Sequence, residues 1–448
     1  MARETAIRSS RTAASAALRL GERLRQLRVA AGLTQSELAG DRFSKEYVSQ
    51  IERGKTRPTS ETIEWLAVRL GCDAGFLANG VATDERGRLE AALARAETMI
   101  EAHRNEDAAA EYETLVPASR ATGIPELEVR ALVGAGRTQM RVGALRMALE
   151  LLNAARGIVE ASNFSDLERA EVYFALGICR YQLNSIQTAL GLLNEALGLA
   201  ERSGMPSDSL RSNILSWRSR CWRRQRDYEA AREDIERALQ LAEDAADPRT
   251  IGDAYFQASM VADREGHWIL ARTYAEKARA AYEDLSDLVH VGQLKNNLGG
   301  FNFMLGKTEE AIGLLKEAFG IALETGREAD AAQAVSSLAQ IHLRTGDVAQ
   351  AEEQARHALR LLDGREDYLD ETGSAQLVLG RALLEQDRLD EAEAAFADAE
   401  ASFGQLGSAS HRAAAWVARG DLAARRGDDR LAAHLYRTAA EALQDVRF

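Results

Sequence analysis

The chain has 448 residues, of which 46% are hydrophobic and 28% charged, and it holds only 5 prolines and 6% aromatic residues. Abundant alanine with so little proline favours an almost wholly helical protein, and strand candidates are scarce. No run of about 20 apolar residues is present to span a bilayer. Arg19, Glu22 and Arg23 interrupt any apolar stretch of signal-peptide quality. The composition therefore excludes the membrane-spanning and secreted classes and predicts a soluble cytoplasmic protein.

Charge is divided unevenly along the chain, whose formal net charge is −13. Residues 1–80 hold 13 Lys and Arg against 9 Asp and Glu, a net charge of +4, whereas the rest hold 43 against 60, a net charge of −17. The asymmetry predicts two domains behind a flexible basic arm at residues 1–17: a head at residues 18–80 and a body at residues 81–448. A small basic head can bind phosphates through local contacts, while an acidic body would repel DNA.

Two helices are predicted at the start of the head. The stretch LRLGERLRQLRVAAG places Leu20, Leu24 and Leu27 at helical spacing. A short second helix follows in TQSELA, where Thr34 is the predicted N-cap and Glu37, three residues later, completes a capping box.

The stretch FSKEYVSQIERG, residues 43–54, predicts a third helix that Ser44 caps and Gly54 ends. Val48 and Ile51 share its apolar face. Its other face carries a cation, an anion, a hydroxyl and an amide, which is the mixture needed to read the edges of DNA bases. A two-sided helix of this kind predicts packing on one side and recognition on the other.

A fourth helix is predicted in PTSETIEWLAVRLG, and Phe76 and Leu77 are expected to complete the core from a fifth. Two short helices between longer ones are the helix-turn-helix arrangement. The segments GERLRQLRVAAGLTQSELA and SQIERGKTRPTSETIEWLAVRLG closely resemble the Cro and phage-repressor class of that motif, the XRE family, over about residues 18–80. The turn GDRF is one residue shorter than is usual in the family, which predicts an altered angle of the third helix.

This resemblance implies that the third helix enters the major groove of DNA. Lys45 would then reach guanine, Gln50 adenine, and Glu46 would accept from cytosine, each good pair discriminating by about 1–3 kcal/mol. The implied DNA contacts, phosphate contacts included, are Gln35, Ser44, Lys45, Glu46, Ser49, Gln50, Lys55 and Arg57. The alternative is an ordinary solvated helix face, with Ser44 acting only as a cap.

The body repeats itself eight times. Alanines recur at intervals of 40–42 residues, at Ala148, Ala189, Ala231, Ala271, Ala311, Ala351, Ala392 and Ala432. A second alanine stands seven residues after each, and a small residue stands twelve before each. A larger residue follows four residues after the first alanine, although Ala275 and Ala355 break that rule. The pattern predicts pairs of antiparallel helices that cross where small side chains let the backbones approach.

This spacing resembles the tetratricopeptide repeat. A period of 40–42 also fits HEAT or armadillo repeats, but the spacing within each hairpin favours tetratricopeptide repeats with longer helices. The resemblance implies an all-α fold in which the five-helix head precedes a right-handed α-superhelix of about nine hairpins, including a degenerate first unit near residues 85–123.

The first helix of each hairpin is expected to line a concave groove. The residues expected to face a peptide or protein partner there are Arg137, Arg141, Tyr181, Asn213, Arg220, Arg224, Asn296 and Gln340. Arginines in an acidic body would suit a carboxylate-bearing peptide. Alternatively, they pair with glutamates of neighbouring repeats.

No residues suggest catalysis or a cofactor. The Gly-Lys-Thr at residues 306–308 lacks the spacing and the preceding strand of a phosphate-binding loop. The seven histidines form no HxxxH motif or Cys/His cluster, so no metal is expected. Cys72, Cys179 and Cys221 have no CxxC spacing and are predicted to be free thiols in a reducing compartment. We therefore expect no enzyme, no cofactor and no metal.

A DNA-binding head on a tetratricopeptide body resembles the RRNPP group of peptide-responsive transcription regulators. The resemblance implies a homodimer that binds double-stranded DNA and responds to a peptide in its groove, without a membrane. Two alternatives stay open: a protein-docking scaffold that the head localises on DNA, and a modulator of a phosphoprotein, since the RRNPP group includes such members.

Overall fold

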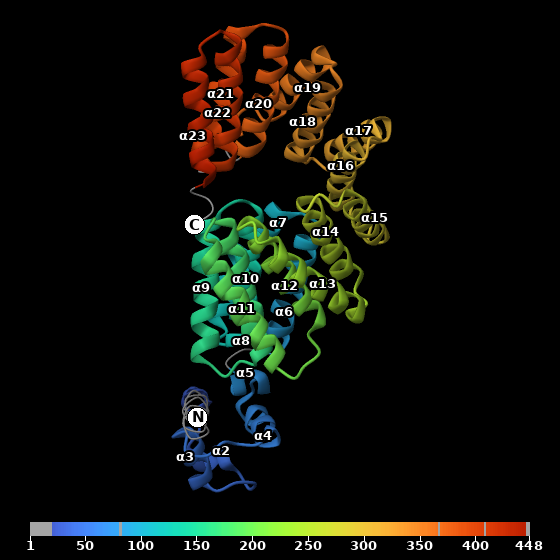
Figure 1. Cartoon of the computed structure of the whole chain (residues 1–448). Coiled ribbons are helices and arrows are strands. Elements are labelled where there is room, and N and C mark those ends of the chain that lie inside the picture. Colours follow the sequence, from blue (N-terminus) through green and yellow to red (C-terminus); the bar gives the residue numbers. More distant parts are fainter. Residues whose placement is uncertain (1–19, 80–82, 366–367, 407–408, 445–448) are drawn as a thin grey trace. The chain divides into compact units, whose positions relative to one another are not determined.

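The computed structural model describes residues 20–79, 83–365, 368–406 and 409–444, and these are helices joined by turns with no strand (Figure 1). The all-α prediction is therefore confirmed. The predicted arm at residues 1–17 lies outside the described residues. The chain divides into two compact units, one up to Cys221 and one from Trp222 on. The division falls within the body, so the predicted boundaries at residues 17 and 80 stay predictions.

The head consists of five helices, as predicted. They are residues 20–30, α2 (Gln35–Ala39), α3 (Lys45–Glu52), α4 (Ser60–Leu70) and α5 (Ala74–Asn79). Leu24, Leu38, Val48 and Ile51 are fully buried and belong to one hydrophobic cluster that all five helices share. Burying such side chains contributes about 1.5–3 kcal/mol each, which a domain of this size needs.

The predicted caps of the short helices are present. The Thr34 hydroxyl accepts from the Glu37 amide at 3.2 Å while the Glu37 carboxylate accepts from the Thr34 amide at 2.7 Å. Ser44 caps α3 in the same way, accepting from the Tyr47 amide at 3.1 Å. These bonds satisfy amides that the first helical turn leaves without partners, so they fix where each short helix begins.

The prediction that Phe76 is part of the core was wrong. Leu77 is 1% exposed, whereas Phe76 is 37% exposed. Neighbouring residues on a helix point about 100° apart, so a short helix such as α5 cannot bury both on one face.

The body consists of helical hairpins. In the first unit the helices are α6 (Thr83–Glu101), α7 (Asn105–Ala121), α8 (Pro125–Arg141), α9 (Leu145–Ala161), α10 (Asp166–Gln182), α11 (Ile186–Arg202) and most of α12 (Asp208–Arg224). In the second they are α13 (Tyr228–Ala245), α14 (Pro248–Arg264), α15 (Trp268–Asp284), α16 (Leu288–Met304), α17 (Thr308–Glu324), α18 (Glu328–Thr345), α19 (Val348–Leu361), α20 (Leu369–Glu385), α21 (Leu389–Gln405), α22 (Ala409–Arg425) and α23 (Asp429–Gln444). From α6 on, eight pairs of successive described helices contact each other as hairpins, and α12 and α13 follow in chain order where the sequence predicts a further pair.

Small residues mark where the two helices of a hairpin cross. A Cβ added at Gly299 would lie 2.7 Å from Leu315 Cγ, and one at Gly380 would lie 2.4 Å from the Phe396 ring. The glycine thus accommodates the large residue of the second helix. Three hairpins have a small residue that carries a Cβ. In two of them, those of Ser259 and Ala339, the large position is the exceptional Ala275 or Ala355, whereas the third, that of Ser219, keeps Ile235. At Ala275 and Ala355 the smaller side chain leaves room for the added Cβ at the crossing.

A matched pair of glycines in α16 tests this packing. Gly299→Ala should lower the free energy of unfolding by about 1–3 kcal/mol, because the added methyl overpacks against fully buried Leu315. Gly300→Ala should raise it by about 1 kcal/mol, because that position meets open space and alanine favours the helix. Thermal unfolding of the two variants measures the difference. Equal shifts in the same direction would contradict a tight crossing at Gly299.

The first helices of successive hairpins also contact one another. In the first unit α6 contacts α8 and α8 contacts α10; in the second, α16 contacts α18, α18 contacts α20, and α20 contacts α22. Side chains on this shared face are the ones expected to line a groove in tetratricopeptide repeats, and we call it the groove side of each unit. No helix in the described ranges is long and apolar enough to cross a membrane.

Candidate DNA interface and repeat groove

Helix α3 has the two faces that its sequence predicts. Val48 and Ile51 are buried in the head, whereas Lys45, Glu46 and Gln50 are exposed. Ser49, also on the predicted reading face, is half-buried. The exposed side therefore offers an ammonium, a carboxylate and an amide from one rigid helix, which is the chemistry needed to contact base edges in a major groove.

A buried ion pair holds α3 against the rest of the head. The Arg28 guanidinium donates to both oxygens of Glu52, at 2.6 and 3.2 Å, and also to the Leu33 carbonyl at 2.8 Å. Gln35, at the start of α2, donates its amide to the same Glu52 carboxylate at 2.7 Å. The first helix, α2 and α3 are thereby tied to one buried charge.

This network bears on Gln35, the predicted phosphate contact. Its side-chain nitrogen is already bonded within the head, so any contact with DNA would come from a side chain that Glu52 orients. Sequence reasoning did not identify Arg28 as the partner of Glu52. The sequence did contain a signal for this pair, because Arg28 and Glu52 are polar residues on otherwise apolar helix faces.

The loop after α3 carries the other predicted DNA contacts. Gly54 has φ +66° and ends the helix, and its amide donates to the Ile51 carbonyl at 2.9 Å. The Lys55 amide donates to the Gln50 carbonyl at 2.9 Å, which completes a Schellman motif. Lys55 and Arg57 are both exposed beside α3, where cations could contact phosphates.

Turn geometry between α2 and α3 follows from Gly40. This residue has φ +54°, in the left-handed region that glycine adopts without strain, and its amide donates to the Ser36 carbonyl. The Phe43 amide then donates to the Ala39 carbonyl at 3.2 Å. The short turn is thus closed by backbone bonds, and the altered angle of α3 stays a prediction.

In the first unit, the groove side gathers an aromatic and cationic group. The rings of Tyr181, from α10, and Trp217, from α12, meet edge to face with centroids 5.5 Å apart. The Arg220 guanidinium lies over the Trp217 ring, 4.2 Å from its centroid. Arg218 instead donates to the Asn194 side chain of α11 at 2.9 Å. Arg218 and Arg220, two residues apart, therefore lie on different faces of α12.

The remaining predicted groove residues differ in exposure. Arg137, Arg141, Arg224 and Gln340 are exposed, while Asn213 is half-buried. The structure brings Tyr181 and Arg220 into one group, on either side of Trp217.

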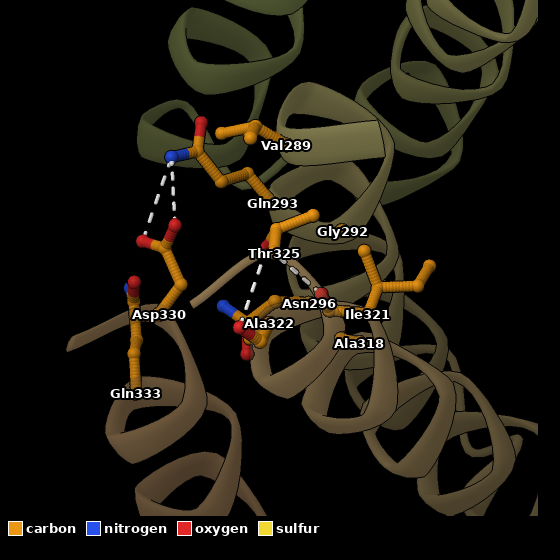
Figure 2. Close-up of a pocket in the computed structure, with 10 residues that line it drawn as sticks. All are labelled: Val289, Gly292, Gln293, Asn296, Ala318, Ile321, Ala322, Thr325, Asp330 and Gln333. Carbon is orange, nitrogen blue, oxygen red and sulfur yellow. Dashed lines mark hydrogen bonds between the residues drawn. The ribbon is translucent and has the colours of Figure 1, made fainter. Parts of the chain in front are cut away.

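In the second unit, a small pocket lies between α16, α17 and α18 (Figure 2). Its polar lining includes the predicted Asn296, whose side-chain oxygen accepts from the Ser337 hydroxyl at 3.2 Å. Gln293 points at Asp330 and donates to its carboxylate at 3.3 Å, as Figure 2 shows. Sequence reasoning missed Gln293 and Gln333, which also lines the pocket. Both stand six residues before the small residue of their repeat, a position that could have identified them.

The same groove side continues along α14, α16 and α18. Asn297 donates to the Met260 sulfur at 3.5 Å, and the Arg344 guanidinium lies 5.9 Å from the centroid of the Phe303 ring. Amide, thioether and aromatic groups therefore alternate on this face. Such a surface can bind an extended peptide through both its backbone and its apolar side chains.

A half-buried carboxyl near this pocket, that of Glu371, provides a pH test. Burial raises the pKa of Glu371, in the first turn of α20, and the charges of Asp370 and Asp330 raise it further. The pKa of Glu371 is higher in the folded chain than in the unfolded chain, so the folded chain binds more protons at pH values between the two. The chain therefore loses stability as the pH rises through this range. Glu371→Gln should therefore unfold at a higher temperature than the parent chain at pH 7.

The gain in unfolding temperature should disappear as the pH falls below 4.5, the ordinary pKa of glutamate. Thermal unfolding at pH 4 and pH 7 measures it. Glu309→Gln is the matched control, since Glu309 is exposed in the first turn of α17 and its charge favours the helix dipole. A neutral-pH gain of the same size in both variants would rule out burial as the cause.

Comparison with known protein families agrees with this geometry. Residues 19–79 match the family described as helix-turn-helix domain, and residues 290–363, 337–406 and 377–446 match families described as tetratricopeptide repeat. The chain is a helix-turn-helix protein with tetratricopeptide repeats. The resemblances to a helix-turn-helix domain and to tetratricopeptide repeats are thus confirmed.

Among curated proteins, the chain is similar to the HTH-type transcriptional regulator DdrOP3 of Deinococcus deserti. The two are 42% identical over 65 residues, which are 14% of this chain and 50% of the relative. The chain therefore spans about half the length of the curated relative that it matches.

Solved structures share the fold of the repeats. The apo quorum sensor NprR from B. thuringiensis aligns with a TM-score of 0.56 and 12% identity, over 80% of this chain and 99% of its own. A Rap protein complexed with Competence and Sporulation Factor aligns at 0.54 and 17%, over 80% and 98%. Aspartyl phosphate phosphatase F from Bacillus subtilis aligns at 0.51 and 14%, over 86% and 93%. This likeness to RRNPP proteins concerns the fold alone.

Proposed function

We propose that this helix-turn-helix protein is a sequence-specific transcriptional regulator whose repeat groove binds a peptide or protein partner and thereby modulates DNA binding. The observation that carries the first half is α3, whose apolar face is locked into the head while Lys45, Glu46 and Gln50 are exposed. The helix-turn-helix family match covers this segment, and the chain is 42% identical over 65 residues to a transcriptional regulator. Under this proposal the chain acts in the cytoplasm by binding, without catalysis.

Two features support a peptide or protein partner. The repeats of the first unit offer aromatic rings that meet edge to face, and those of the second unit offer amides and a thioether, all groups that can bind an extended chain. Among proteins that share the fold, one is a quorum sensor and one was solved with Competence and Sporulation Factor. We further propose a homodimer, because one head buries little DNA surface and two heads on symmetric half-sites add their binding energies.

The mechanism is a coupling free energy between groove and DNA site. The repeats have two arrangements, and a partner that binds one of them better shifts the affinity for DNA. The shift is the ratio of the partner's affinities for the two arrangements, typically 5- to 150-fold. DNA must shift the partner's affinity by the same factor. This reciprocity distinguishes coupling from simple tethering.

The first test is selection of binding sites from random duplex DNA by the full chain. Emergence of one palindromic site, with affinity that falls steeply as salt rises, is the expected result. Failure to enrich any site would refute the DNA-binding half of the proposal.

The second test measures binding to that site by fluorescence anisotropy with a library of short synthetic peptides, for the parent chain and for Asn296→Ala. At least one peptide should change DNA affinity, and the substitution should weaken its effect. DNA binding that no peptide alters would favour the docking scaffold. The third alternative, a modulator of a phosphoprotein, rests only on the fold that the chain shares with phosphatase F. If it holds, site selection should yield no DNA site.

A further inference from the structure

A group of large apolar side chains is exposed at the beginning of α15, in the second unit. Ile269 is 68% exposed and Leu270 is 42% exposed, and in the described parts of the chain they are the only consecutive large apolar residues that are both exposed. Single exposed apolar residues are common on protein surfaces, whereas a contiguous group of them marks an interaction site.

These side chains border an open hollow. Trp268, Ile269 and Leu270 line it from α15, and Leu305 lines it from the turn before α17. No residue lines both this hollow and the groove-side pocket of Figure 2. The hollow is therefore a second surface of the same hairpins, separate from the place proposed for a peptide.

The packing of the repeats does not account for this apolar group. Ile269 and Leu270 are the two residues before the first alanine of their repeat, and in the other seven repeats at least one residue of this pair is polar. The equivalent pair in the next repeat is Glu309 and Glu310. A hairpin of this kind therefore forms without two apolar residues here, so their presence indicates a contact with another molecule.

The charges beside the hollow fit a second copy of this chain. Arg264, the last residue of α14, and Glu309, in the first turn of α17, are both exposed. Neither side chain has a hydrogen bond or an ion pair within the described residues. A strongly acidic or basic partner would match only one of the two charges. A twofold axis between them instead brings Arg264 of each copy to Glu309 of the other.

The shape of this surface also fits a second copy. Ile269 is the most exposed of the large side chains at the edge of the hollow, so it can enter the hollow of another copy. The twofold axis makes the reverse contact identical. An apolar centre with a charged rim is the usual composition of an interface between two proteins.

We propose that Ile269, Leu270 and the hollow beside them form a twofold interface between two copies of this chain, with Arg264 of each copy paired with Glu309 of the other. The inference rests on the proposed function, for which it supplies the surface that joins the homodimer. Because this surface is separate from the groove-side pocket, the dimer leaves that pocket open to a peptide.

Sedimentation velocity of the full chain over a range of concentrations tests the interface. The parent chain should be a dimer. Ile269→Glu should weaken the dimer by about 100-fold or more, because symmetry places two carboxylates in the apolar contact. Leu323→Glu is the matched control and should leave the dimer unchanged, since Leu323 is 51% exposed in the last turn of α17 and does not line the hollow.

Charge reversal tests the pairing of Arg264 with Glu309. Arg264→Glu and Glu309→Arg should each weaken the dimer by about tenfold or more, because like charges then meet at two places. An equimolar mixture of the two variants should recover the dimer, because opposite charges then meet at both places. Misfolding does not explain such a result, since misfolded chains would not recover on mixing.

A dimer that Ile269→Glu leaves intact would overturn the inference, and so would a mixture of the charge variants that stays monomeric. In both cases the homodimer of the proposed function survives and uses another surface. A parent chain that is monomeric at every concentration would overturn the homodimer together with this interface. DNA binding is decided separately by site selection, so its failure is distinguishable from the failure of the interface.

Discussion

Replacing Glu52 by glutamine is expected to unfold the head while leaving the repeats intact. Its carboxylate is the single anion to which Arg28 and Gln35 donate, and its side chain is 4% exposed. The Arg28 side chain is 12% exposed, so loss of the charge leaves a nearly buried guanidinium without its counterion. Breaking a buried pair on one side costs about 3–5 kcal/mol, which is most of the stability of a domain this small.

Hydrogen exchange followed by mass spectrometry measures this in the full chain. Amides of residues 20–79 should lose protection in Glu52→Gln, and those of the repeats should keep it. Binding to the selected DNA site should disappear together with that protection. Glu46→Gln is the matched control, because it makes the same chemical change at an exposed position of the same helix. It should alter stability by less than about 0.5 kcal/mol.

Protection of the head that is equal in the Glu52 and Glu46 variants would contradict this account. It would mean that the hydrophobic cluster around Leu24 and Ile51 fixes α3 unaided. A double variant provides a further check. If Arg28→Met restores protection to Glu52→Gln, then the unpaired guanidinium, and not the lost hydrogen bond to Gln35, is the cause.

Local features of the head could be predicted because the residues that cause them are neighbours in the sequence. Thr34 and Glu37 form their capping box within one helical turn, and Ser44 reaches the Tyr47 amide over three residues. The repeats were predictable for a related reason. The spacing of small residue and alanines recurs eight times, and at five of these crossings a glycine faces a large side chain as Gly299 faces Leu315, so the pattern reveals a contact that one copy would hide.

Contacts between distant segments were not predictable in the same way. Arg28 is one of several arginines in the first helix of the head, and only the folded chain shows that it is the one that reaches Glu52. The hydrogen bond from the Thr56 hydroxyl to the Gln50 side-chain oxygen was not predicted, because it depends on how the chain turns after Gly54. Trp217 was likewise missed, since its partner Tyr181 is on another hairpin. In each case the position of the side chain depends on the packing of whole helices.

Lys45 and Lys55 are expected to affect DNA binding in different ways. Lys45 is the first residue of α3 and is exposed, so under the proposed function it contacts a base. Lys45→Ala should reduce affinity for the selected site by about 5- to 150-fold and relax the preference at one base pair. Lys55, in the loop beyond α3, should contact phosphate. Lys55→Ala should weaken selected and random duplexes equally and reduce the slope of log K against log salt by about 1.

Anisotropy titrations of both duplexes over a range of salt concentrations separate the two effects. Unfolding does not explain a loss in Lys45→Ala, because a cation in the first turn opposes the helix dipole and its removal should stabilise α3 slightly. If both variants lose the same affinity for both duplexes, α3 lies along the phosphate backbone of the DNA and does not enter the major groove. Specificity would then have to come from the shape of the DNA, and the exposed face of α3 would contribute only charge.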